Sequence, residues 1–225
     1  MVYESNERDR EIMKKILVLI LSLLFVLSGC FQADNTKESS TKVNTNDKAV
    51  ILYFSKPEMN GSDTVAGASR VVTENEEILG NVEQLATWIA EDTKYPLAKI
   101  ETTENYPDDH EVLVDQATTE RSSDFRPELK PLNVDLTEYD TIYIGYPIWW
   151  SDLPMAMYSF FEKNDLAGKT IIPFSSHGGS GLAGTVETVE KLSKDASVET
   201  SNVLSISRDD IPNSRKEVEN WLKSF

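Results

Sequence analysis

The sequence is poor in the residues that build disulfides and most metal sites. It contains one cysteine, Cys30, and two histidines in 225 residues. A single cysteine excludes an intrachain disulfide. The chain also shows no metal-ligand spacing, no Ser-His-Asp elbow and no paired-carboxylate pattern. The sequence therefore indicates neither a metal centre nor a hydrolase site of these kinds.

Basic residues are scarce as well. The chain has 22 Lys and Arg residues against 38 Asp and Glu residues, a formal net charge of -16. This balance argues against nucleic acid as a partner and predicts repulsion from anionic lipid. It is compatible with a basic protein partner. We expect most of the charge to form a solvated surface. Acidic residues around a ligand crevice, in contrast, would disfavour negative charge on the ligand.

No hydrophobic run is long enough to span a membrane as a helix. The apolar run of residues 16–27 follows Lys14 and Lys15 and ends in Leu27-Ser28-Gly29-Cys30. This is the basic, apolar and small-residue order of a secretory signal. The ending resembles the lipobox of bacterial lipoproteins. The resemblance implies cleavage before Cys30, diacylglycerol on its thiol, and an extracytoplasmic protein anchored to the cell membrane.

These features divide the chain into three parts. Residues 1–29 are predicted to be a lipoprotein signal peptide, with Met13 as the more natural start. Residues 30–47 comprise the lipidated Cys30 and a polar, flexible tether. Residues 48–225 form the folded domain, and no repeat or low-complexity tract divides it. The alternative is an ordinary secreted protein with a buried free thiol.

Strand and helix patterns alternate through the domain. The predicted strands are residues 49–54, 95–101, 141–146, 170–175 and 197–206, and the predicted helices are residues 81–92, 108–121, 154–163, 182–192 and 211–222. Five strands with intervening helices predict an α/β fold with a doubly wound, five-stranded parallel sheet. Ligands of such sheets bind at the carboxyl ends of the strands.

Two segments at strand ends indicate the kind of ligand. Pro147 ends the buried third strand, so that Ile148, Trp149 and Trp150 follow in a short loop. Two adjacent indoles suit a flat aromatic ring, although they are also compatible with core or edge packing. The fourth strand is followed by a loop whose backbone amides have few Cβ atoms around them: Ser176, His177, Gly178, Gly179, Ser180 and Gly181.

The glycines of this loop permit a second interpretation. Gly179, Gly181 and Gly184 satisfy the G-x-G-x-x-G spacing of a dinucleotide site between a strand and a helix. The motif falls in the penultimate strand-helix unit, however, and too little sheet follows it for a dinucleotide fold. We therefore expect a loop that approaches the edge of a planar ring.

The segments Gly-Tyr-Pro-Ile-Trp-Trp and Pro-Phe-x-x-His-Gly-Gly-Ser-Gly, at residues 145–150 and 173–181, resemble one branch of the flavodoxin-like proteins. The resemblance covers residues 48–225. It implies the strand order 2-1-3-4-5 and flavin mononucleotide (FMN) at the carboxyl ends of the strands. Residues 147–150 would flank the isoalloxazine ring, the loop 176–181 would approach its pyrimidine side, and the first strand-to-helix loop would hold the phosphate.

The phosphate loop departs from the family pattern. Ser55 follows the first strand, but the glycine and asparagine of the pattern come only after an insertion of residues 56–79, as Gly80, Asn81, Val82 and Glu83. Val82 lacks the expected threonine hydroxyl, a loss of about 1 kcal/mol, while amides at the helix start remain. Glu83 suits the helix dipole but not a neighbouring phosphate.

The resemblance implies oxidoreduction, because a flavin accepts a hydride or single electrons. The expected activity is either reduction of quinone-like small acceptors or electron transfer to a protein partner. NAD(P)H is scarce outside the cytoplasm, which favours membrane quinol or another flavoprotein as donor. The alternative is a binding lipoprotein that retains the fold without redox turnover.

Two side chains have open roles at this stage. His177 either contacts the flavin and assists proton transfer, or caps its own loop. Arg126 either pairs with Glu120 or faces a substrate.

Overall fold

The computed structural model describes residues 48–57, 59, 70–72 and 76–225. The predicted signal peptide, the lipidation site Cys30, the tether and most of the 56–79 insertion lie outside the described residues. No helix within the described part of the chain is long and apolar enough to cross a membrane.

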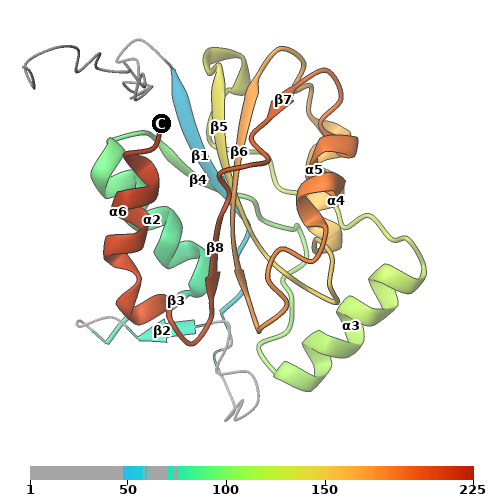
Figure 1. Ribbon diagram of the computed structural model, residues 1–225. Coiled ribbons are helices and arrows are strands. Elements are labelled where there is room, and N and C mark those ends of the chain that lie inside the picture. Colours follow the sequence, from blue (N-terminus) through green and yellow to red (C-terminus); the bar gives the residue numbers. More distant parts are fainter. Residues whose placement is uncertain (1–47, 58, 60–69, 73–75) are drawn as a thin grey trace, which may run out of the picture. The chain divides into compact units, whose positions relative to one another are not determined.

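The described residues form a parallel main sheet of six strands (Figure 1). Its strands are β1 (Ala49–Tyr53), β4 (Leu97–Lys99), β5 (Thr141–Pro147), β6 (Thr170–His177), β7 (Ser197–Val198) and β8 (Leu204–Ser207). The spatial order is β4-β1-β5-β6, and β7 and β8 both pair with β6. This arrangement confirms the predicted α/β fold class and the order 2-1-3-4-5.

The fifth predicted strand, residues 197–206, is wrong as a continuous element. It consists of β7 and β8, and the residues between them leave the sheet. The carboxylate of Glu199 accepts hydrogen bonds from the backbone N–H groups of Ser201 and Asn202, at 2.8 and 2.9 Å. This local turn competes with the strand ladder and interrupts it.

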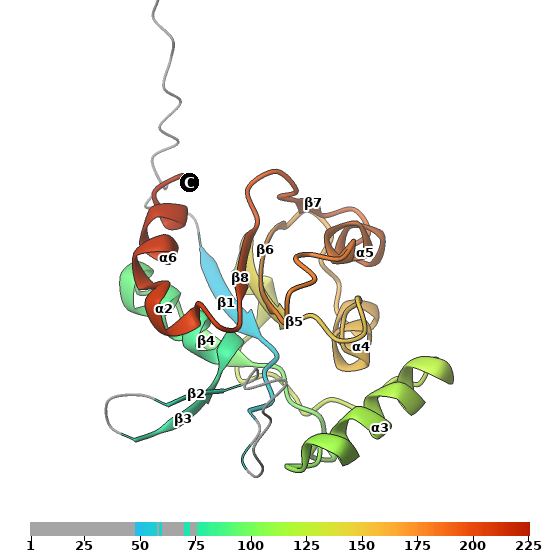
Figure 2. The same ribbon diagram turned by 60° about the horizontal axis from the view of Figure 1, so that its bottom comes forward.

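Helices cover both faces of the sheet (Figures 1 and 2). One face carries α2 (Asn81–Thr93) and α6 (Arg215–Leu222), and the other carries α4 (Met155–Lys163) and α5 (Thr185–Leu192). Helix α3 (His110–Ser122) lies outside α4, away from the centre of the sheet (Figure 2). The last predicted helix is divided into a 3-10 turn, η3 (Ile211–Asn213), and α6. A further 3-10 turn, η2 (Leu136–Glu138), precedes β5.

The hydrophobic core has two halves because side chains alternate along each strand. In β1, Val50 and Leu52 pack into the half beneath α4 and α5, whereas Ile51 packs into the half beneath α2 and α6. All three side chains are fully buried. A central strand buried on both faces explains the continuous apolar run in the sequence.

A small antiparallel hairpin precedes α2 and was not predicted. It consists of β2 (Arg70–Val72) and β3 (Ile78–Gly80), and β3 leads directly into α2. The insertion thus ends in ordered structure beside the start of the helix.

The close contact between α2 and β5 depends on Gly145. A Cβ atom at this position would lie 2.4 Å from two ring atoms of Phe174 and 2.8 Å from Cγ1 of Val82. Phe174 belongs to β6 and is fully buried, so neither neighbour can move into solvent. The missing side chain lets the first turn of α2 lie directly on the sheet.

We expect the Gly145→Ala substitution to lower the free energy of unfolding by about 1–3 kcal/mol, because the added methyl group overpacks this contact. Urea denaturation of the purified protein measures the change. Adding Phe174→Leu removes the two clashing ring atoms, so the double variant should be more stable than additivity of the single changes predicts. Strict additivity would contradict the packing role of Gly145.

Candidate functional site

Strands β1, β5, β6 and β8 end at one edge of the sheet, and a pocket of about 280 Å³ lies there. This edge is at the bottom of Figure 1 and comes forward in Figure 2. The pocket brings together most of the residues selected from the sequence: Ser55, Asn81, Val82, Pro147, Ile148, Trp149, Trp150, Ser176, His177 and Gly178. Gly80, Glu83, Gly179, Ser180 and Gly181 do not line it.

The floor of the pocket includes the start of α2. Gly80 precedes the helix, and a Cβ atom on it would lie 2.0 Å from Oγ of Ser55. This approach brings the helix start against the end of β1. Among the described residues, no side chain caps the helix at Gly80, and Asn81 and Val82 line the pocket. The amides of the first turn and the helix dipole favour an anionic group at this end.

Glu83 does not belong to the pocket, contrary to its selection from the sequence. Its carboxylate accepts a 2.8 Å hydrogen bond from the phenol of Tyr53 and lies 3.3 Å from Nζ of Lys99. Burial, followed by the charge of Glu83, raises the pKa of the Tyr53 phenol. The side chain of Glu83 therefore ties α2 to β1 and β4 and does not face an anion at the helix start.

The two tryptophans have different environments. Trp149 packs edge-on against Phe54 and Tyr106, with ring centroids 5.6 and 5.4 Å apart. Trp150 is 49% exposed. Both line the pocket. Trp149 is thus part of the aromatic core beneath the pocket, whereas Trp150 is the more accessible ring at its edge.

A tight turn holds Trp150 in place. The backbone N–H and C=O groups of Trp149 and Asp152 exchange two hydrogen bonds of 2.9 Å, and Trp150 and Ser151 between them have φ angles of 53° and 58°. This is the pattern of a type I′ turn, which normally contains glycine or asparagine. Bulky residues rarely adopt positive φ. The turn is therefore strained, and other contacts must stabilise it.

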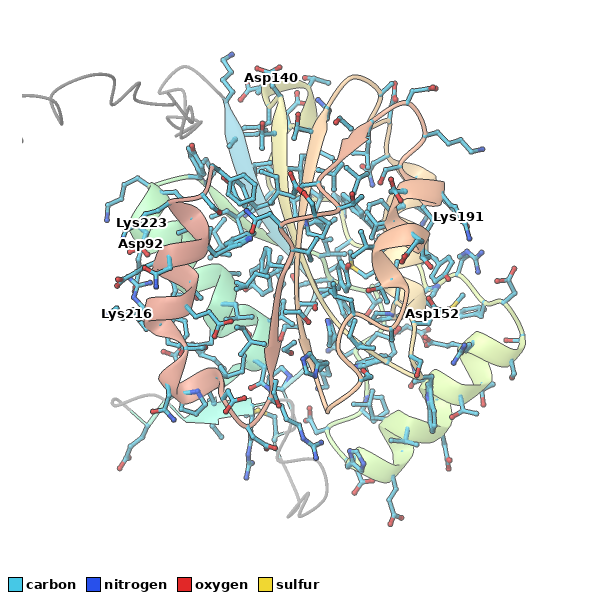
Figure 3. The ribbon with its side chains drawn as sticks, in the orientation of Figure 1. Asp92, Asp140, Asp152, Lys191, Lys216 and Lys223 are labelled. Carbon is cyan, nitrogen blue, oxygen red and sulfur yellow. The ribbon has the colours of Figure 1, made fainter. Side chains whose placement is uncertain are left out.

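Helix α3 supplies those contacts. The guanidinium of Arg121 donates a hydrogen bond to the carbonyl oxygen of Trp150 and lies 3.9 Å from the carboxylate of Asp152. Asp152, which lies on the α3 and α4 side of the sheet (Figure 3), also accepts hydrogen bonds of 3.1 Å from the phenol of Tyr158 of α4. The tryptophan turn is thus linked to both helices.

Helix α3 also forms one wall of the pocket, which the sequence-based selection missed. Its pocket-lining residues are His110, Leu113, Val114 and Ala117. They follow the i, i+3, i+4, i+7 spacing of one helical face, so this signal was present in the sequence. Asp109 caps the helix by accepting a 3.1 Å hydrogen bond from the N–H of Val112.

The open question about Arg126 is answered by its contacts. It pairs with Glu162 at 2.8 Å and with Asp124 at 2.7 Å, and lies over the ring of Tyr158. These carboxylates raise the pKa of its guanidinium. Glu120 instead accepts a buried 2.7 Å hydrogen bond from the phenol of Tyr106.

The loop after β6 is shaped by His177. Its Nδ1 accepts a 3.0 Å hydrogen bond from the N–H of Gly179, so the imidazole does cap its own loop. The ring also lines the pocket. Burial lowers the pKa of His177, and the opposing charge of Asp210 is the smaller influence. A neutral imidazole with a proton on Nε2 follows from the acceptor role of Nδ1.

The dinucleotide interpretation of the same loop does not fit the structure. Gly179, Gly181 and Gly184 have φ angles of 112°, 59° and 81°, and they form the turn that leads into α5. Within the described residues, Gly178 is the glycine that lines the pocket. The spacing therefore reflects the backbone requirements of a turn.

The charge of the pocket is opposite to that of the protein. Lys56 and Arg208 line it, and among its described lining residues there is no aspartate or glutamate. Lys56 pairs with Asp108, just before α3. The sequence-based selection missed both cations. The described lining therefore does not meet the condition, acidic residues around the crevice, under which negative charge on the ligand would be disfavoured. No group of three or more potential metal ligands occurs in the described part of the chain.

The chain is similar to known proteins in sequence and in structure. Residues 78–225 match the family model described as flavodoxin. A candidate flavoprotein from Bacteroides uniformis has a similar structure, with 26% identity, a TM-score of 0.58, and coverage of 79% of this chain and 98% of that one. A flavoprotein from Lactobacillus acidophilus NCFM in complex with FMN has 19% identity, a TM-score of 0.52, and coverage of 78% and 99%. No curated protein matches.

We expect the imidazole of His177 to titrate below its ordinary value of 6.5, because burial disfavours the charged form. The proton NMR titration of a His110→Asn variant measures this directly, since His177 is then the one remaining histidine.

The sign of the linked stability follows from the same shift. The unfolded chain binds the proton more readily, so His177 lowers stability as the pH falls through 6.5 toward its folded pKa, and this penalty vanishes above 6.5. Replacing His177 with Asn should flatten that part of the stability profile. A folded pKa at or above 6.5 would contradict the role of burial.

Proposed function

Because the chain belongs to the flavodoxin family, we propose that its domain is a flavoprotein that binds FMN at the carboxyl edge of the sheet. The observation that carries this proposal is the composition of one pocket. It combines two indoles, the backbone of Gly178, the start of α2 and two cations, with no carboxylate among its described lining residues. The complex of the Lactobacillus acidophilus protein with FMN supports the choice of cofactor.

Each part of the pocket suits one part of FMN. Pro147, Ile148, Trp149 and Trp150 would hold the isoalloxazine ring, and the segment of Ser176, His177 and Gly178 would supply polar groups at its edge. Ser55, Asn81, Val82 and Lys56 would hold the phosphate with the amides of α2. The ammonium of Lys56, which pairs with Asp108, would donate a further hydrogen bond to the phosphate where Val82 lacks a hydroxyl. Gly80 would contribute to the phosphate site indirectly, because its backbone lies close to Ser55 and brings the start of α2 to that residue.

Bound FMN would accept a hydride or single electrons, and the protein would position it and exclude water. We propose a role in oxidoreduction, either in reducing quinone-like small acceptors or in passing electrons to a protein partner. The second candidate, a flavin-free binding module, is favoured by the departure of the phosphate loop from the family pattern at Val82. The visible absorption spectrum of the purified protein separates them, because only a flavoprotein is yellow.

We further propose that Cys30 anchors the protein to the outer face of the cell membrane. The support is the order of residues 14–30, a basic pair, a short apolar run and a lipobox-like ending. Such an anchor would place the pocket near membrane quinones and away from cytoplasmic NAD(P)H.

We expect the protein to bind FMN more tightly than FAD, because the helix start favours a terminal phosphate. We also expect Trp150→Ala to weaken FMN binding about tenfold through loss of stacking and buried area. Flavin fluorescence quenching measures both affinities.

Trp88→Ala is the matched control, since Trp88 lies on α2 outside the pocket and packs against Arg215. It should leave FMN affinity unchanged. Trp149→Ala is a less specific probe because Trp149 also packs against Phe54 and Tyr106. Unchanged affinity in the Trp150 variant would place the stacking contact elsewhere, and a colourless protein that binds neither flavin would sink the flavoprotein proposal.

We expect the Cys30→Ala substitution to give an uncleaved or mislocalised precursor, because stable attachment requires the acyl chains on that residue. Cell fractionation and mass spectrometry of the mature amino terminus measure the outcome. Normal membrane-bound protein from this variant would show that the apolar segment itself is the anchor.

A further inference from the structure

The pocket is an electropositive site in a strongly acidic chain. The protein carries a formal net charge of -16, yet the described lining of the pocket includes Lys56 and Arg208 and no carboxylate. A cleft lined by one sign of charge concentrates the opposite charge. Because Asp108 pairs with Lys56, the positive charge that favours a negatively charged ligand comes mainly from Arg208.

The two cations belong to different ends of the pocket. Lys56 follows β1 and lies next to Ser55, at the start of α2. Arg208 follows β8, and β5 and β6 separate β8 from β1 in the sheet. With strands roughly 4.8 Å apart, the ends of β1 and β8 are about 14 Å apart. A single anionic group of the ligand therefore cannot lie close to both cations.

Arg208 is held against the loop that follows β6. Its backbone N–H donates a 2.9 Å hydrogen bond to the carbonyl oxygen of His177. Its guanidinium Nη1 lies 3.4 Å from where a Cβ atom on Gly178 would be. The side chain is 21% exposed, and its Nε lies 3.8 Å from the carboxylate of Asp209, which is 83% exposed. The positive charge thus lies beside the Gly178 backbone, within the pocket.

We propose that Arg208 binds negative charge on the ring portion of the ligand and so favours the reduced state of bound FMN. The inference rests on the proposed function. A flavin ring that takes up two electrons and one proton carries one negative charge, whereas the oxidised ring is neutral. A cation beside the ring stabilises only the charged state, so Arg208 raises the affinity for reduced FMN relative to oxidised FMN.

This role favours one of the two redox activities. Stabilising the fully reduced ring makes the second electron easier to add after the first. The ring is then suited to exchanging two electrons together, as in the reduction of a small quinone-like acceptor. Arg208 thus favours two-electron reduction of a small acceptor over one-electron transfer to a protein partner.

The test is a dithionite titration of the full chain, purified in detergent and loaded with FMN, against a reference dye. Each dithionite ion and two water molecules give two bisulfite ions, two protons and two electrons, and the ring takes both electrons and one proton. Arg208→Gln should bind reduced FMN about tenfold more weakly relative to oxidised FMN, which corresponds to a two-electron midpoint about 30 mV lower. Arg208→Met, which keeps much of the apolar stem, should give the same shift.

Two further variants are controls. Arg208→Lys keeps the charge and should keep a midpoint close to that of the wild type. Lys216→Gln removes one exposed positive charge from α6, on the far side of the sheet from α3 (Figure 3), and should leave the midpoint unchanged.

The affinities for oxidised FMN and riboflavin separate ring binding from phosphate binding. If Arg208→Gln weakens oxidised FMN but not riboflavin and leaves the midpoint unchanged, Arg208 binds the phosphate and the inference is wrong. An equal shift in the Lys216 variant would also overturn it, as an effect of net charge alone. If the wild-type protein binds no flavin, the proposed function is wrong and the inference falls with it. If the wild-type protein binds FMN but Arg208→Gln leaves the midpoint unchanged, the inference alone is wrong.

Discussion

The absence of a side chain at Gly145 is the constraint on which the candidate site depends. Val82 of α2 and Phe174 of β6 occupy the space that a Cβ atom would need. Helix α2 therefore begins directly over the central strands, and its first amides lie at the carboxyl edge of the sheet. Gly80 has a similar effect directly before the helix, where it allows contact with Ser55. Two close approaches of backbone thus place a helix start at the floor of the pocket.

The wall of the pocket depends on a different kind of contact. Helix α3 has little apolar surface in common with the sheet, and few of its side chains, such as Leu113 and Ala117, are buried. Polar contacts hold it at both ends: Lys56 pairs with Asp108 before the helix, and Arg121 binds the carbonyl of Trp150 near its end. The position of Trp150 and the position of α3 are therefore coupled.

Electrostatics distinguish the pocket from the rest of the surface. Glu83 lies in the first turn of α2, but its carboxylate is bound by Tyr53 of β1 and Lys99 of β4 and does not line the pocket. Asp108 neutralises Lys56, while Arg208 adds positive charge near Gly178. An acidic protein surface and a pocket that attracts anions are compatible because charge in a cleft acts at short range and surface charge is screened by salt.

The sequence by itself determined the features that depend on local patterns. Alternating apolar strands and helical periodicity predict the doubly wound sheet, and Pro147 and the glycines after β6 mark the loops at its carboxyl edge, because backbone restrictions act within a few residues. Only the tertiary structure decided that Arg208 and the α3 face line the pocket, that Glu83 turns toward Lys99, and that Trp150 rather than Trp149 is the accessible ring. These outcomes depend on contacts between residues far apart in the chain, such as Arg121 with Trp150 and Arg208 with Gly178, which no local pattern specifies.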